Sequence, residues 1–174
     1  MSIESVPLST GSVDKATRRL PPGFVLVNRY AIQEVIGMGG MGAVYCARDM
    51  HFPNVEKLVA VKEMLNLAVD PLVRRTIVEN FEREAHILAT LTHPSIPKIF
   101  DYFTYDERSY LVLEYIDGED LELMLDEEEG FFPVEKVVDW GIELCDVLRY
   151  LHAHQPEPII FRDMKPSNVM INRE

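Results

Sequence analysis

The sequence predicts an α+β fold, in which an antiparallel sheet of five strands, interrupted by one helix, precedes a mainly helical region. Three strand-like runs at 30–37, 42–49 and 58–64 are each bounded by glycine, proline or polar clusters. The sequence next predicts one helix and a hairpin, and then a second long helix from its three-and-four spacing of apolar residues. Strands followed by helices favour segregated α+β architecture, and this order suits two lobes.

Composition limits the classes of partner. The 174 residues suffice for one domain with a real core or for part of a larger one. The formal net charge of −12 argues against a nucleic-acid partner, because a polyanion would be repelled. Eight of the thirteen residues from Asp117 to Glu129 are acidic, which favours a solvated helix face over a site for a basic partner.

The cysteines and the apolar runs indicate the compartment. Cys46 and Cys145 lie far apart and match no metal or redox spacing, so we expect both to be buried and reduced. No apolar run approaches the roughly 20 residues of a membrane helix, and residues 1–20 lack the apolar core of a signal peptide. We therefore expect this segment to be cytoplasmic.

The helices are predicted from their start signals. Residues 1–28 show no periodicity and are predicted to be a flexible tail. Asp70 can cap the first helix, with Pro71 at its first position. Its apolar stripe comprises Ile77, Phe81, Leu88 and Leu91. The hairpin follows at 98–116, and Pro133 opens the second helix.

Two opposite charges lie where apolar side chains are expected. Glu84 falls inside the stripe of the first helix, and Lys62 shares a strand face with Ala60. Either side chain could reach water alone. Because an unpaired buried charge costs several kcal/mol, we predict instead that the two side chains pair. A lysine held in this way can direct its charge at a phosphate.

Three glycines, Gly37, Gly39 and Gly42, lie between two predicted strands. Glycines let backbone N–H groups approach phosphate oxygens closely. The strand–turn–strand context disfavours dinucleotide binding, which needs a helix next. Further along, "IIFRDMKPSNVM" at 159–170 places an acid, a base and an amide within six positions. Phosphoryl transfer needs such groups together, because it depends on positioning and charge.

Together these segments resemble the eukaryotic-like (Hanks-type) serine/threonine protein kinases, with features of the bacterial members. The resemblance covers about residue 24 to the last residue, in the family's order and spacing. The segments that carry it are "GMGGMGAV" at 37–44, "VAVK" at 59–62, Glu84, "LEYI" at 113–116 and "FRDMKPSN" at 161–168. It implies an ATP-binding N-lobe at 29–116, and a hinge side and truncated C-lobe at 117–174.

The resemblance also implies roles for single residues, with ATP and Mg²⁺ as cofactors and a protein Ser/Thr hydroxyl as acceptor. Lys62, oriented by Glu84, would hold the α- and β-phosphates. Asp163 would accept or orient the hydroxyl proton, Lys165 would steady the phosphoryl group, and Asn168 would bind Mg²⁺. The remaining residues implied to bind ATP are Ile36, Gly37, Gly39, Gly42, Val44, Ala60, Leu113, Glu114, Ile116, Asp120 and Met170.

The chain departs from the family pattern in two places. Phe161 stands where the family usually has His, and we interpret the aromatic ring as a tolerated replacement. The family's metal-binding Asp-Phe-Gly should follow Asn168 within roughly twenty residues, but the sequence does not contain it. We therefore expect a fragment of a longer kinase that is inactive by itself. The alternatives are a non-catalytic nucleotide-binding or docking module and a kinase of small molecules, which fits "RDMKPSN" less well.

Overall fold

The computed structural model describes residues 19–39, 42–65, 70–127 and 131–173. The chain forms two compact units, each described here by itself. The first contains the residues up to Thr90 together with 98–115, and the second contains 91–97 and the residues from Ile116 onward. The loop at 91–97, which we expected in the N-lobe, thus groups with the second unit.

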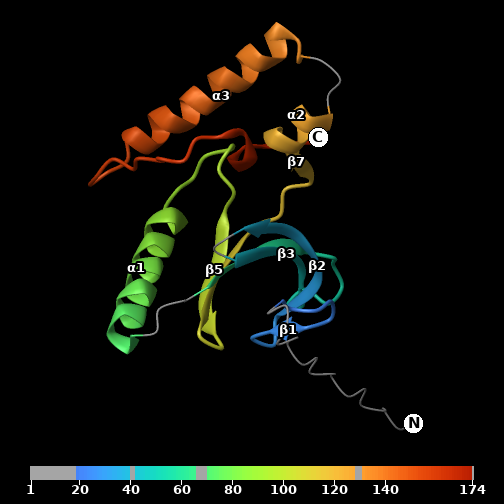
Figure 1. The fold of residues 1–174 in the computed structure, drawn as a ribbon, viewed down its shortest axis with the longest axis vertical. Coiled ribbons are helices and arrows are strands. Elements are labelled where there is room, and N and C mark those ends of the chain that lie inside the picture. Colours follow the sequence, from blue (N-terminus) through green and yellow to red (C-terminus); the bar gives the residue numbers. More distant parts are fainter. Residues whose placement is uncertain (1–18, 40–41, 66–69, 128–130, 174) are drawn as a thin grey trace. The chain divides into compact units, whose positions relative to one another are not determined.

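The first unit is built on one antiparallel sheet (Figure 1). Its strand order is β1-β2-β3-β4-β6-β5. The strands are β1 Val25–Leu26, β2 Tyr30–Gly39, β3 Gly42–Asp49, β4 Leu58–Leu65, β5 Ile99–Tyr105 and β6 Arg108–Glu114. The predicted hairpin is confirmed: Asp106 and Glu107 join β5 to β6 with φ of 47° and 61°, the turn geometry that matches strand twist. The sheet has six strands rather than five, because β1 pairs with β2.

The hydrophobic core lies on one face of this sheet and includes residues that we predicted to be a flexible tail. Leu20, Phe24 and Leu26 are buried there, and the backbone N–H of Leu20 donates to the Tyr45 hydroxyl at 3.3 Å. The tail boundary at residue 28 is therefore wrong for 20–28, because these apolar side chains cover the core face of the sheet. Residues 1–18 of the predicted tail lie outside the described residues.

A charged network lies within this core face. The Glu63 carboxylate is 2.6 Å from the Arg108 guanidinium and accepts hydrogen bonds from the hydroxyls of Tyr45 and Tyr110. Glu63 is 4% exposed. Burial and the neighbouring carboxylate raise the pKa of Tyr110, which keeps that hydroxyl protonated as a donor. The sequence analysis did not identify this network, because Glu63 alternates with Lys62 like any polar strand residue.

Helix α1, Pro71–Ala89, starts as predicted: the Asp70 side chain accepts a hydrogen bond from the backbone N–H of Leu72 at 2.8 Å. The helix runs beside β5 (Figure 1) and buries Phe81 and Ala85. Ile77 and Leu88, which the spacing placed in the same stripe, are about 40% exposed. The face of α1 that packs on the sheet is therefore rotated from the predicted stripe.

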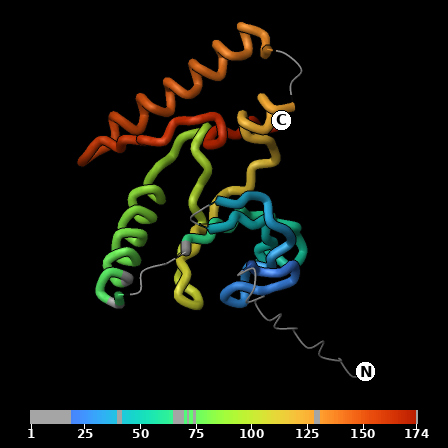
Figure 2. Tube along the Cα trace, in the orientation of Figure 1, coloured from blue at the N-terminus to red at the C-terminus, as the bar shows by residue number. Residues whose placement is uncertain are grey.

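The second unit is mainly helical. It contains β7 Gly118–Asp120, α2 Leu121–Glu127, α3 Val134–His152, the 3₁₀ turn η1 Pro166–Asn168 and β8 Met170–Asn172. After α3 the trace reverses and returns to pair β8 with β7 (Figure 2). A Cβ on Gly118 would lie 2.1 Å from the Ile171 carbonyl oxygen, so this pairing requires glycine. No helix in the described part of the chain is long and apolar enough to cross a membrane.

Candidate active site

Three predicted catalytic residues come together in the loop before β8. The Asn168 Nδ2 donates to the backbone oxygen of Asp163 at 2.8 Å and to its Oδ2 at 2.9 Å. The Lys165 ammonium lies 3.3 Å from the same Oδ2. All three side chains are exposed, so the cluster is open to a ligand. The carboxylate is held in place from two sides, by an amide and by a cation.

The electrostatics of the cluster keep the carboxyl group of Asp163 ionised. The hydrogen bond from Asn168 is the main cause that lowers the pKa of Asp163, and Lys165 lowers it further. A carboxylate with a lowered pKa is a weak base. It is suited to orienting a hydroxyl and to accepting its proton late, when that oxygen is already bonding elsewhere.

The backbone of the loop explains why these side chains meet. Arg162 has a φ of 62°, uncommon for a side chain other than glycine, and the N–H of Asp163 donates to the Phe161 carbonyl at 2.8 Å. Pro166 then starts the 3₁₀ turn, and the N–H of Asn168 donates to the Lys165 carbonyl at 3.0 Å. Two tight turns in succession thus bring residues 163 and 168 to hydrogen-bond distance.

The short β7–β8 sheet brings together two residues that the sequence implied for ATP. Asp120 and Met170 are direct cross-strand partners. One oxygen of Asp120 accepts a hydrogen bond from the N–H of Leu123 at 2.9 Å and so caps the start of α2. Asp120 therefore has a structural role at the start of α2, and its contact with ribose stays a prediction. Ile116, another residue that the resemblance implied for ATP binding, is half-buried.

The first unit carries the other predicted residues on the sheet face opposite its core. Ladder pairs join Val44 to Lys62 and Ala60 to Leu113, so each pair shares this face. Val44, Ala60 and Leu113 are only half-buried, whereas the core face is closed. Ile36 is 43% exposed. An apolar surface that remains half-open beside a lysine suits a flat aromatic ligand with a charged tail.

The glycines of the first hairpin serve different purposes. A Cβ on Gly42 would lie 2.2 Å from the Glu63 carbonyl oxygen, and the φ of Gly42 is +146°, so the fold requires glycine there. A Cβ on Gly39 would have nothing within 4 Å, and at Gly37 it would make an ordinary contact with Val44. The space beside Gly39 is therefore open, as a close approach to phosphate requires.

The predicted ion pair between Lys62 and Glu84 is absent. Both residues are described and exposed, and no ion pair joins them within 4.0 Å. The reason is the rotation of α1: Phe81 and Ala85 face the sheet, which leaves Glu84 at the side of the helix. This prediction is wrong for the conformation described here.

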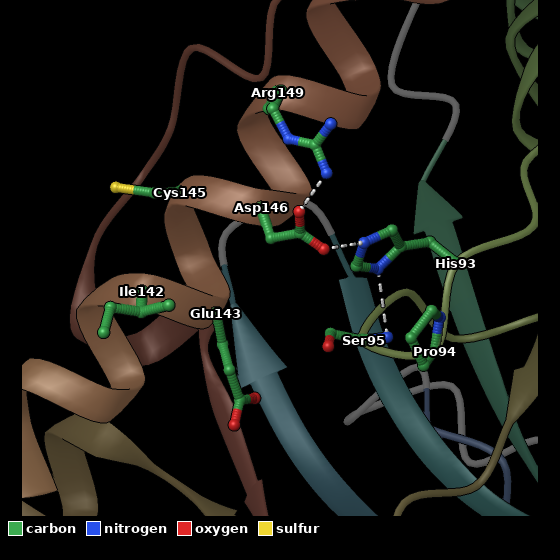
Figure 3. Close-up of a pocket in the computed structure, with 8 residues that line it drawn as sticks. All are labelled: His93, Pro94, Ser95, Ile142, Glu143, Cys145, Asp146 and Arg149. Carbon is green, nitrogen blue, oxygen red and sulfur yellow. Dashed lines mark hydrogen bonds and ion pairs between the residues drawn. The ribbon is translucent and has the colours of Figure 1, made fainter.

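The second unit also has a pocket between the loop at 91–97 and helix α3 (Figure 3). None of the predicted site residues lines it. His93 Nε2 lies 3.1 Å from Asp146, whose other oxygen binds Arg149, and His93 Nδ1 accepts the N–H of Ser95. The N–H of Thr92 also donates to Tyr150. These contacts fasten the loop at 91–97 to α3, and no sequence pattern indicated them.

Comparison with known proteins identifies the family. Residues 30–174 match the protein kinase domain, and the chain belongs to the protein kinase family. It is 35% identical over 146 residues to serine/threonine-protein kinase B of Synechocystis, covering 83% of this chain and 25% of that protein. It is 37% identical to a probable serine/threonine-protein kinase PknB of Corynebacterium glutamicum, covering 85% and 22%.

A solved structure supports the same fold. The kinase domain of Mycobacterium tuberculosis PknI is 27% identical, with a TM-score of 0.70 over 89% of this chain and 59% of that one. The predicted family and fold class are confirmed. The chain spans about a quarter of the length of the relatives named above.

Proposed function

We propose that this chain carries the ATP-binding and catalytic-loop parts of a serine/threonine protein kinase, which transfers the γ-phosphate of ATP to a protein hydroxyl. The cluster of Asp163, Lys165 and Asn168 carries this proposal, since it unites a carboxylate, a cation and an amide within one short loop. The relatives named serine/threonine-protein kinases support the choice of acceptor.

In this function Asp163 orients the acceptor hydroxyl. As the hydroxyl oxygen bonds to the γ-phosphorus and the bond from that phosphorus to the β–γ bridging oxygen breaks, the hydroxyl proton passes to the Asp163 carboxylate. Lys165, already 3.3 Å from that carboxylate, offsets negative charge on the transferring group. The electron pair of the broken bond stays on the bridging oxygen, which leaves as part of ADP.

In this function ATP would bind to the residues that the family resemblance implied. Val44, Ala60 and Met170 would contact adenine, and the backbone of Glu114 and Ile116 would read its edge. Lys62 would bind the α- and β-phosphates, with the open backbone at Gly39 beside them. Glu84 can orient Lys62 only after α1 moves.

Mg²⁺ would be held by Asn168. Its amide nitrogen serves Asp163, which leaves the amide oxygen for a hard cation. In the part of the chain that the structure describes, no group of three or more His, Cys, Asp or Glu residues could hold a metal. Binding would therefore depend on nucleotide phosphates as additional ligands, as is usual for Mg²⁺. When bound, the metal would neutralise phosphate charge.

The test is phosphate transfer from ATP to a protein substrate by the full-length protein. Lys62→Met and Asp163→Asn should each lower the rate by about a hundredfold or more, as loss of a group acting on the transition state does. Lys98→Met, which changes an exposed lysine of the same unit, should leave the rate unchanged. Unchanged transfer in Lys62→Met would refute the proposal.

A second candidate is a nucleotide-binding or docking module without catalysis. The absent Lys62–Glu84 pair favours it, because kinases need that pair for transfer. This candidate predicts that ATP and Mg²⁺ raise the melting temperature while no transfer occurs. We also place the segment in the cytoplasm, where ATP is available and free thiols would persist. Cys46 is buried as predicted, whereas the prediction of a buried Cys145 is wrong, because its side chain lies on the exposed side of α3.

A further inference from the structure

One tyrosine of β5 contacts two side chains of helix α1. The ring of Tyr102 meets Phe81 edge-on, with centroids 6.4 Å apart, and meets the His86 ring at 5.2 Å. The Tyr102 hydroxyl also lies 3.0 Å from His86 Nε2, a hydrogen-bond distance. Tyr102 is thus held by two side chains of α1 five positions apart, which fixes both the place and the rotation of the helix.

The same tyrosine lies in one cross-strand row with Lys62. Leu111 pairs with Tyr102 on one side and with Lys62 on the other, so the three side chains share a sheet face. Neighbouring strands lie about 4.8 Å apart, which puts the backbones of Tyr102 and Lys62 about 10 Å apart. The helix is therefore anchored two strands away from the lysine.

The rotation set by this anchor turns Glu84 aside. At 100° per residue, His86 lies about 140° to one side of Phe81, and Glu84 lies about 60° to the other. Ala85 lies about 40° from Phe81 on the side of His86, and both residues are buried, so the face on the sheet is centred between Phe81 and Ala85. Glu84 and His86 flank this face on opposite sides, and both side chains are exposed. A rotation that turns His86 toward the sheet therefore turns Glu84 away from it.

We propose that the Tyr102–His86 contact holds α1 in the rotation that separates Glu84 from Lys62, and that its release allows this ion pair to form. The inference rests on the proposed function, in which Glu84 orients Lys62 toward ATP phosphates. Tyr102 and His86 are positioning residues, acting through Glu84 without touching the nucleotide. The structure has the contact and lacks the ion pair, and we infer that the two are alternatives whose equilibrium sets the affinity for ATP.

Tyr102→Phe tests this directly, because it removes the hydroxyl and keeps the ring packed on Phe81. In the full-length protein, we expect this variant to bind ATP with Mg²⁺ about two- to tenfold more tightly, the effect of one net hydrogen bond on the equilibrium. His86→Leu should give a similar gain, and the double variant no more than either alone. Tyr105→Phe, on the same strand, is the matched control and should bind like the wild type, since the Tyr105 hydroxyl makes no hydrogen bond in the described part of the chain.

A second variant, at Glu84, distinguishes an effect on the Lys62–Glu84 ion pair from a general loosening of the fold. In a Glu84→Gln background, the gain from Tyr102→Phe should vanish, because no carboxylate is left to pair with Lys62. The inference is overturned if Tyr102→Phe binds ATP no more tightly than the wild type, or if its gain survives in Glu84→Gln. Failure of the proposed function looks different: the wild type itself would not bind ATP, and Lys62→Met would change nothing.

Discussion

Substitution of Gly42 by alanine tests the geometry of the first hairpin. The new Cβ would lie 2.2 Å from the carbonyl oxygen of Glu63 and 2.9 Å from its carbonyl carbon, both in the backbone of β4. The φ of +146° adds strain of about 1–3 kcal/mol for a residue with a side chain. Moving β4 away from β3 adds an overpacking cost of about 1–3 kcal/mol. We expect a total destabilisation of about 3 kcal/mol.

The expected loss is large enough for two independent assays. For a domain of about 100 residues, about 3 kcal/mol lowers the melting temperature by roughly 12 °C or more, measurable by circular dichroism. Amide hydrogen exchange should show the loss in β3 and β4. The matched control is Gly39→Ala, where the Cβ meets nothing within 4 Å, and it should melt within a few tenths of a kcal/mol of the wild type. A Gly42→Ala protein that melts within about 2 °C of the wild type would refute the close approach of β3 to β4.

Three further predictions concern the stability of the first unit. Glu63→Gln removes the charge beside the buried Arg108 guanidinium and should cost about 3 kcal/mol in urea unfolding; a cost below about 1 kcal/mol would mean that the pair is solvated. The hydrogen bond from Arg29 lowers the pKa of Asp49 below 3.8, so its stabilisation is present above pH 3.8 and is lost as the pH falls through the lower, folded-state pKa. Asp49→Asn should abolish that part of the acid dependence, and unaltered acid unfolding curves would contradict the assignment. Leu20→Ala should cost about 2 kcal/mol or more, as for other core leucines, whereas a mobile tail predicts no change in melting temperature.

Much of the site could be predicted from short-range patterns. Asp163 and Asn168 are five positions apart, and the turn chemistry of Pro166 is local, so their meeting follows from the sequence alone. The same holds for the cap at Asp70 and for the hairpin at 106–107. These features depend on neighbours within a few residues, which is the range that propensity and spacing describe.

Features that depend on distant partners were missed or misplaced. The apolar stripe of α1 predicted that Leu88 would share the buried face with Phe81, but the aromatic side chains available on β5 decided the rotation. Residues 20–28 lack periodicity, yet Leu20 and Phe24 found a place on the core face. Composition could not show this, because burial of an irregular segment depends on the surface it meets.

The sequence by itself determined the family, the strand and helix order and the catalytic loop, because each rests on local spacing and turn chemistry. Only the tertiary structure decided which way α1 faces, why Gly42 must be glycine, and that Lys62 and Glu84 stand apart. The physical reason is common to all three: each depends on the packing of one element against another far along the chain, where side-chain shape selects among arrangements that the local pattern leaves equivalent.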